Sequence, residues 1–220
     1  GHRLNLYRET TPHAGFDILL NWSKGKEYFC YTSNVDGAYQ KAGFDPLRVV
    51  ECHGSIHHLQ PMNGGKSDFT WLIKDDACWE DIKDFIYDDE TELMPQSIVS
   101  ADPFEVTINE EELLAEGELP RDDDGSLLRP NILMFGDWGW DSSRTDEQYD
   151  RFSEFLKSQR SSKVVVIEIG AGKVIPSVRS KGNALADLGA TLVRINPRDF
   201  DGAEYGIPMG GLEGLKRIQA

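Results

Sequence analysis

The chain has 220 residues, long enough for one α/β domain with a smaller appendage, and carries a formal net charge of −15. This acidic balance argues against nucleic-acid binding, because contacts with phosphates need clustered Lys and Arg side chains. The longest apolar run, around residues 164–169, is far shorter than the ~20 residues of a transmembrane helix, so we expect neither a nucleic-acid nor a membrane partner.

The first sixty residues predict alternating helices and strands. Apolar side chains follow Pro12 at helical spacing, and Lys24-Gly25 is typical of a helix end. The strand, helix, strand order favours a right-handed crossover and a parallel sheet. The predicted elements are a helix between Pro12 and Lys24, a strand at 27–32, a short helix at 36–42 closed by Gly43, and a strand at 49–52.

Residues 61–128 have a different character and predict a small acidic α+β module. Acidic side chains recur between Asp75 and Asp124. They form either a solvated face or an acidic rim that attracts lysine-rich polypeptides. The predicted elements are strands at 69–73 and 104–108, a helical turn at 110–116, and loops at 63–65 and 122–125.

After Arg129 the alternating pattern resumes. Together with residues 1–60 it predicts a Rossmann-like, doubly wound parallel sheet, so the predicted domains are 1–60, 61–128 and 129–220. The predicted elements are strands at 131–135, 163–169 and 191–195, and helices at 145–157, 175–188 and 210–218, with Tyr149, Phe152, Phe155 and Leu156 of the first helix facing inward.

Polar residues follow the first two predicted strands. Asn34 and Asp36 come after one strand and His53 after the next. Open α/β sheets bind ligands at the carboxyl ends of their strands, so these side chains could face one crevice. Alone, an Asn-x-Asp-Gly segment is more often a turn, and a single His after a strand is more often a surface or capped residue.

The pattern resembles the sirtuin (Sir2) family in several segments that occur in the family's order. Thr32, Asn34, Asp36 and Gly37 resemble its Thr-Gln-Asn-Ile-Asp-Gly segment, and His53-Gly54 resembles its His-Gly pair. Three later segments are also similar to the family: Arg129 to Asp137, Val164 to Gly172 and Leu192 to Asn196.

This resemblance implies an NAD-dependent protein lysine deacylase, which transfers the acyl group to ADP-ribose, releases nicotinamide and acts on acylated lysine in a protein or peptide. His53 would be the general base for a ribose hydroxyl, with Asn34 and Asp36 as its catalytic companions. The implied cofactor residues are Thr32, Ser33, Asn34, Asp36, Gly170, Ala171, Gly172 and Asn196. The implied substrate residues are Leu133, Met134, Phe135 and Gly136.

The chain also departs from the family. Nothing like its Gly-Ala-Gly-x-Ser loop occurs before Tyr28, so we expect a carboxyl-terminal portion of a longer protein. Ser33 replaces Gln, Ala171-Gly172 replaces Thr-Ser, and Asp137 replaces Glu. Two alternatives therefore remain: an NAD-dependent ADP-ribosyltransferase or NAD hydrolase, and a non-catalytic binding module.

Cysteine usage predicts a cytoplasmic protein without zinc. Cys30, Cys52 and Cys78 are an odd number without paired spacing, which is typical of reduced thiols. The Cys-x-x-Cys pairs of most sirtuins are missing. A site formed by Cys78, His57 and His58 is disfavoured, because adjacent residues of an extended chain point to opposite faces and zinc needs four ligands.

Overall fold

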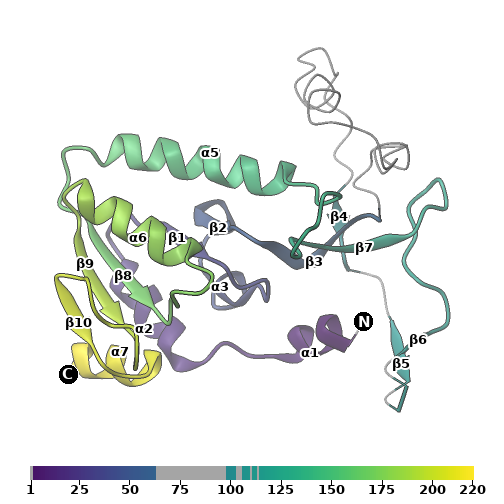
Figure 1. The fold of residues 1–220 in the computed structure, drawn as a ribbon, viewed down its shortest axis with the longest axis horizontal. Helices are drawn as coiled ribbons and strands as arrows, with labels where there is room; N and C mark the ends of the chain where they lie inside the picture. Colours follow the sequence, from purple (N-terminus) through teal and green to yellow (C-terminus); the bar gives the residue numbers. More distant parts are fainter. Residues whose placement is uncertain (1, 63–97, 103–105, 110, 113) are drawn as a thin grey trace. The chain divides into compact units, whose positions relative to one another are not determined.

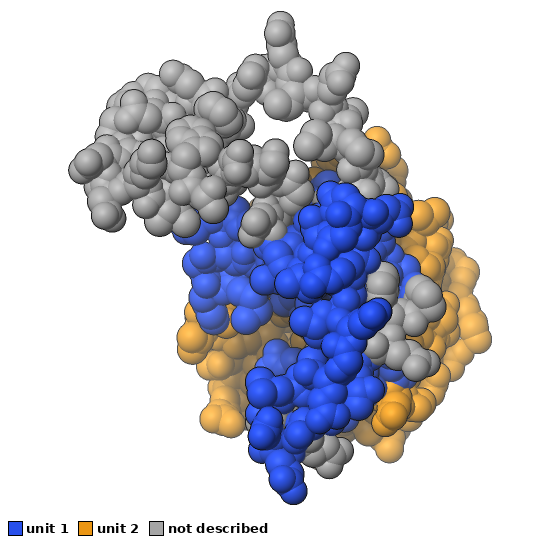
Figure 2. All heavy atoms as spheres, turned by 90° about the vertical axis from the view of Figure 1, so that its right-hand side faces the viewer, with its two compact units in different colours: residues 1–8, 54–144 blue, residues 9–53, 145–220 orange. Residues whose placement is uncertain are grey.

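A computed structural model describes residues 2–62, 98–102, 106–109, 111–112 and 114–220. It divides into two compact units, coloured separately in Figure 2: unit 1 is Gly1–Arg8 with Gly54–Arg144, and unit 2 is Glu9–His53 with Thr145–Ala220. The domain boundaries predicted from the sequence remain predictions, and the predicted elements at 63–65 and 69–73 lie outside the described residues. Among the described helices, none has the length and apolarity needed to cross a membrane.

Unit 2 contains two parallel sheets (Figure 1). In the first, β1 (Cys30–Thr32) pairs with β2 (Val49–Glu51). In the second, β9 (Thr191–Ile195) lies between β8 (Val165–Ile169) and β10 (Tyr205–Ile207). The accompanying helices are α2 (Ala14–Ser23), α3 (Ala38–Lys41), the 3-10 turn η1 (Pro46–Arg48), α5 (Ser143–Ser158), α6 (Ser177–Asp187) and α7 (Gly211–Gln219).

Helices cover both faces of these sheets, because strand side chains alternate between two apolar layers. Cys30 and Val49 pack against α2 and α3, whereas Val50 packs on the opposite face against α5. In the second sheet Ile195 packs against α2 and α7, whereas Leu192 lies beside α6. Unit 2 is therefore a three-layer α/β arrangement, with α2 and α7 on one side and α5 and α6 on the other.

Most elements predicted for unit 2 are present. The strand at 191–195 is confirmed to the residue, and the helix at 145–157 extends over Ser143–Ser158 with Phe152 buried as predicted. Two expectations were incomplete. β10 was not predicted, because Tyr205–Ile207 contains a glycine and is too short to show alternation. The strand expected at 163–169 is β8, which begins at Val165, and this residue is 59% exposed.

Unit 1 is built on antiparallel pairing. β3 (Gly54–Pro61) lies between β4 (Val99–Ser100) and β7 (Leu128–Ile132). The strands β5 (Thr107–Asn109) and β6 (Leu114–Glu116) form a separate hairpin, and α1 spans His2–Glu9. Gly54 has a φ of +80°, and a Cβ there would lie 2.1 Å from the carbonyl oxygen of Asn131. The glycine of the His53-Gly54 pair is thus required by the close approach of β7.

Two elements predicted for unit 1 were wrong. Within 110–116, expected to be a helical turn, residues 114–116 form β6, so Glu116 lies on an exposed hairpin instead of a helix. The strand expected at 131–135 is β7, which ends at Ile132. The turn that follows the strand is closed by an ion pair between Asp137 and Arg129.

Candidate functional site

The loop after β1 holds the first group of predicted site residues. The amide of Cys52 donates to the carbonyl of Thr32 at 2.9 Å, which extends the parallel pairing to the end of β1. The Thr32 hydroxyl then accepts the amide of Asn34 at 3.0 Å, and the Asp36 carboxylate accepts the amide of Ala38 at 3.0 Å. Asn34 and Asp36 therefore lie in the loop beyond the strand. Asn34 is exposed, and Asp36 precedes Gly37, the N-cap residue of α3.

His53 follows the end of β2. Its Nε2 lies 3.1 Å from the hydroxyl of Ser177, the first residue of α6. The preceding backbone is fixed by α5, because Gln148 accepts the amide of Glu51 at 2.9 Å and Thr145 donates to its carbonyl at 3.3 Å. The imidazole is thus held by one hydroxyl on a strand end that is itself anchored. This arrangement suits a side chain that must exchange a proton in a fixed position.

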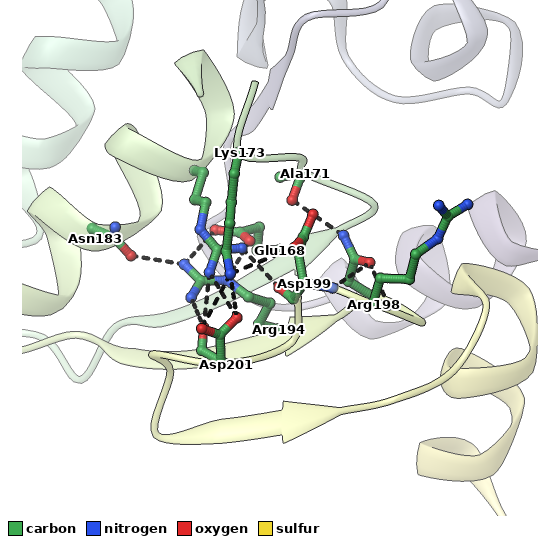
Figure 3. Close-up of polar contacts among 10 residues, drawn as sticks. Glu168, Ala171, Lys173, Asn183, Arg194, Arg198, Asp199 and Asp201 are labelled. Carbon is green, nitrogen blue, oxygen red and sulfur yellow. Dashed lines mark hydrogen bonds and ion pairs between the residues drawn. The ribbon is translucent and has the colours of Figure 1, made fainter. Parts of the chain in front are cut away.

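The turn after β8 carries Gly170, Ala171 and Gly172. A Cβ added at Gly170 or Gly172 would meet nothing within 4 Å, so the backbone borders open space. Asn196, at the end of β9, donates from Nδ2 to the Ala171 carbonyl at 3.1 Å. Its Oδ1 accepts the amides of Arg198 and Asp199, each at 3.0 Å (Figure 3). The structure therefore joins Ala171 and Asn196, and the Asn196 side chain serves to connect two loops.

A buried ion pair beside this turn was not identified from the sequence. Arg194 of β9 bonds both carboxylate oxygens of Glu168 on β8, and both side chains are 1% exposed. Arg194 also donates to Asn183 Oδ1 at 2.7 Å and to the Asp201 carbonyl (Figure 3). The sequence did contain a signal for this ion pair. The apolar strands β8 and β9 each have one charged residue in the penultimate position, and these two residues, Glu168 and Arg194, are paired in the sheet.

The loop after β9 is held from a second direction by α6 and by Lys173. Arg179 donates to the carbonyls of Asp199 and Asp201 at 2.7 and 2.9 Å. The ammonium of Lys173 lies 3.0 Å from the Asp201 carboxylate, and this contact lowers the pKa of Asp201 and raises that of Lys173. Both loops at this end of the second sheet are therefore fixed by side chains before any ligand is present.

The two described cysteines are buried in unit 2. Burial raises the pKa of the Cys30 thiol to about 12 and also raises the pKa of Cys52, which keeps both thiols protonated at neutral pH. Within the residues that the structure describes, no group of three or more His, Cys, Asp or Glu could hold a metal ion. Cys78 lies outside those residues, so the prediction for zinc remains a prediction.

The predicted substrate residues lie in unit 1, in the turn after β7. Arg129 binds Asp137 through two hydrogen bonds, at 2.8 and 2.9 Å. Asp137 in turn closes the turn by accepting the amide of Gly139 at 3.2 Å. Gly136 has a φ of +68°, and the neighbouring side chains point outward, with Met134 58% and Phe135 91% exposed. Leu133 is 39% exposed and, like Met134, follows the end of the strand.

Two fully buried amides support this turn, and they too were missed from the sequence. Gln60 of β3 donates to the carbonyl of Gly139 at 2.7 Å and accepts the side chain of Asn131 at 2.9 Å. The Asn131 amide also donates to the carbonyl of Asp141 at 2.8 Å. These buried hydrogen bonds define one position for the segment they bind, although Asn131 Oδ1 has no hydrogen-bond partner within the described structure. The exposed side chains of Met134 and Phe135 thus belong to a turn whose backbone is held in place.

Comparisons with known proteins agree with this architecture. A model of the Sir2 family matches residues 2–171. Among solved structures, the chain is similar to Sir2 with a p53 peptide and NAD+ (21% identity, 96% of this chain and 70% of that chain, TM-score 0.54). It is also similar to Sir2Tm bound to a propionylated peptide (21% identity, 97% and 72%, TM-score 0.57) and to a mutant Sir2 homologue with ADP-ribose (18% identity, 96% and 66%, TM-score 0.57). No curated protein matches. The predicted resemblance and fold class are confirmed.

Proposed function

The chain belongs to the Sir2 family, and from this premise we propose that it is an NAD-dependent protein lysine deacylase. One observation carries the proposal: His53 stands at the carboxyl end of a parallel strand with its Nε2 held 3.1 Å from the Ser177 hydroxyl. Similar solved structures contain NAD+, ADP-ribose and a propionylated peptide, which supports both the cofactor and the substrate class.

The residues of unit 2 fit NAD. The Gly170–Gly172 turn borders open space, so a nucleotide can approach its backbone closely. Asn34 offers an exposed side-chain amide, with a donor and an acceptor for polar groups of the ribose or nicotinamide. The Asn196 amide is engaged by Ala171 O and two loop amides, so its role toward the adenosine ribose is to shape the loop. NAD, when bound, would supply the ADP-ribose that accepts the acyl group, and nicotinamide would be the leaving group.

The residues of this chain then have distinct tasks. His53 accepts a proton from a ribose hydroxyl, because an imidazole with an unprotonated ring nitrogen can act as a general base. Ser177 orients that ring by its hydroxyl. The Asp36 carboxylate accepts the amide of Ala38, the first residue of α3, and so sets the course of the loop that presents Asn34. Proton acceptance and orientation therefore come from separate elements of unit 2.

The turn after β7 is proposed to meet the substrate. Phe135 and Met134 expose apolar surface of the kind that packs along the aliphatic stem of an acylated lysine. Their turn is fixed by Arg129 and Asp137, so little ordering is needed on binding. The chain's net charge of −15 also favours approach of a lysine-rich polypeptide.

The test measures two products at once. The protein is incubated with NAD and an acetyl-lysine peptide, and nicotinamide and deacetylated peptide are followed by mass spectrometry. We expect both products in equal amounts, a loss of at least about 100-fold for His53→Ala, and unchanged turnover for the control His57→Ala. Equal turnover by His53→Ala and the unsubstituted protein would contradict the proposal.

A second function remains a candidate because the chain differs from the family pattern in the turn after β8. Ala171 and Gly172 replace two hydroxyl side chains of the family, which changes the groups beside the cofactor. Nicotinamide released without deacetylated peptide would indicate an NAD hydrolase, and ADP-ribose attached to protein would indicate an ADP-ribosyltransferase. If the unsubstituted protein forms neither product, the remaining alternative is a non-catalytic binding module.

A further inference from the structure

Arg198 differs from the other basic residues at the carboxyl end of the second sheet. Those residues form ion pairs with nearby carboxylates: Arg194 with Glu168, Lys173 with Asp199 and Asp201, and Arg179 with Asp201. Arg198 is exposed, and its guanidinium has no hydrogen-bond or ion-pair partner among the described residues. Its side chain extends away from the other pairs (Figure 3). Within this network of four cations and three carboxylates, the Arg198 charge is therefore left unbalanced.

The backbone of Arg198 is tied to the turn after β8. Asn196 Oδ1 accepts the amide of Arg198 at 3.0 Å, and Nδ2 of the same side chain donates to the carbonyl of Ala171 at 3.1 Å. The turn itself is open, because a Cβ at Gly170 or Gly172 would meet nothing within 4 Å. One side chain thus connects the unpaired arginine to the turn proposed to approach the nucleotide.

The polar groups of this loop indicate which ligand chemistry it suits. Dinucleotide-binding α/β folds read a free 2′-hydroxyl of the adenosine ribose with an acidic side chain, and accommodate a 2′-phosphate with a nearby arginine. Here the carboxylates of Asp199 and Asp201 are already paired with Lys173, at 3.5 and 3.0 Å. The Asn196 amide is engaged within the loop. The group left for a ligand is the Arg198 guanidinium, whose planar set of donors matches phosphate oxygens.

We propose that Arg198 lets this chain bind a nicotinamide dinucleotide that is phosphorylated on the 2′-hydroxyl of its adenosine ribose, as well as NAD. The inference rests on the proposed function, because it requires the nucleotide to lie on the turn at residues 170–172 with its adenosine ribose toward Asn196. The guanidinium donates to two oxygens of the phosphate monoester. The unbalanced charge of the network is then neutralised by the ligand, in a chain whose net charge of −15 otherwise opposes an additional phosphate.

The test compares two ligands that differ only in this phosphate. The full 220-residue chain is titrated with ADP-ribose and with 2′-phospho-ADP-ribose in a calorimeter, so that no reaction is needed for the readout. We expect 2′-phospho-ADP-ribose to bind at least as tightly as ADP-ribose. Added salt should weaken its binding more than that of ADP-ribose, because the extra contact is between exposed charges.

Substitutions at Arg198 separate a phosphate contact from a general effect of charge. Arg198→Met should weaken 2′-phospho-ADP-ribose at least about tenfold, as expected for the loss of hydrogen bonds to a charged group, and leave the affinity for ADP-ribose unchanged. Arg198→Lys should retain part of the affinity, because it keeps the charge but loses the planar donors. The control Arg160→Met removes an exposed arginine from the turn after α5 and should leave both affinities unchanged. Circular dichroism verifies that the variants are folded.

Each contrary result has a distinct meaning. If Arg198→Met weakens both ligands equally, the guanidinium binds the diphosphate that they share, and the proposal is wrong. If ADP-ribose binds and 2′-phospho-ADP-ribose does not, this inference fails while the proposed use of NAD stands. If neither ligand binds, the inference fails together with the proposed function.

Discussion

Each unit contains an arginine–carboxylate pair beside a candidate site, and the two pairs differ in burial. In unit 2, Arg194 and Glu168 are each 1% exposed and lie between β8, β9 and α6. In unit 1, Arg129 and Asp137 are 17% and 12% exposed and close a turn that carries Phe135. The first pair is part of the packed interior, whereas the second holds a surface segment in place.

The difference teaches how each site obtains its shape. A charge removed from water is costly unless it is paired and hydrogen-bonded, so Glu168 depends on Arg194 and tolerates little change around it. Even Gly182 of α6 is constrained, because a Cβ there would lie 2.7 Å from the Glu168 carboxylate. The proposed cofactor loops thus rest on the interior of unit 2. The proposed substrate turn rests on a pair that water can reach.

The substitution Arg194→Met should have the largest effect on stability and so distinguishes the buried ion pair of unit 2 most clearly from the ion pair of unit 1. The change leaves the Glu168 carboxylate buried without its cation, so we expect the free energy of unfolding to fall by about 3–5 kcal/mol. Urea unfolding followed by circular dichroism measures it. Adding Glu168→Leu should restore part of the loss, and Lys173→Met, at an exposed ion pair, should leave the midpoint unchanged. A midpoint of Arg194→Met equal to that of the parent would remove the distinction between the pairs.

Arg129→Met should have a smaller effect, because Asp137 can be hydrated when its partner is lost. We expect a loss of about 1.5–3 kcal/mol, the range for hydrogen bonds to charged groups. Hydrogen exchange should accelerate at residues 128–137 but remain slow at β8 and β9. Arg151→Met, which breaks a 3.9 Å pair on the surface of α5, is the control. Faster exchange in both units would contradict the local role of the pair.

Sequence reasoning succeeded for unit 2 where one periodicity covered a whole element. The apolar strand at 191–195 and the inward aromatic residues of α5 follow directly from alternation and helical spacing. The end of β1 and the position of His53 were also expected from the polar residues after apolar runs. Where local pattern and packing agree, the sequence is sufficient.

It failed where a distant partner decides the structure. The strand β7 ends at Ile132, and the following turn is closed by Asp137 and Arg129, a side-chain contact that strand alternation does not encode. The buried amides of Gln60 and Asn131 resemble ordinary surface residues until β3 and β7 pair. Unit 1 is antiparallel and is held by side chains far apart in the sequence, so its elements were harder to predict than those of unit 2.

His58 gives unit 1 a distinct response to pH. It lies in β3 opposite Ser100, and burial lowers its pKa from 6.5 to about 4, with Arg144 and His57 adding to the decrease and Asp102 opposing it. The unfolded chain gains a proton below pH 6.5 that the folded chain does not accept until about pH 4. Stability from this group is therefore lost as pH falls between those values and changes no further below them.

The prediction is tested by difference, since the carboxylates titrate in both proteins. Unfolding of the parent and of His58→Gln is measured from pH 8 to pH 3.5. We expect the parent to lose more stability than the variant between about pH 6.5 and pH 4. Hydrogen exchange in that range should accelerate in β3 and β7 more than in β8 and β9. Parallel curves for the two proteins would mean that His58 is hydrated in the folded state.

Phe135→Ser should change stability least and still affect function. The ring is 91% exposed, so its loss should leave the free energy of unfolding within about 0.5 kcal/mol. If the turn meets the substrate, the KM for an acetyl-lysine peptide should rise several-fold while kcat is unchanged, as expected when binding is lost equally in the ground and transition states. Leu188→Ser, 84% exposed at the end of α6, is the matched control and should alter neither constant. An unchanged KM with deacetylation intact would mean that the apolar tip is not the substrate surface. A fall in stability would instead mean that the ring packs within unit 1 and that its turn, like the loops of unit 2, depends on interior contacts.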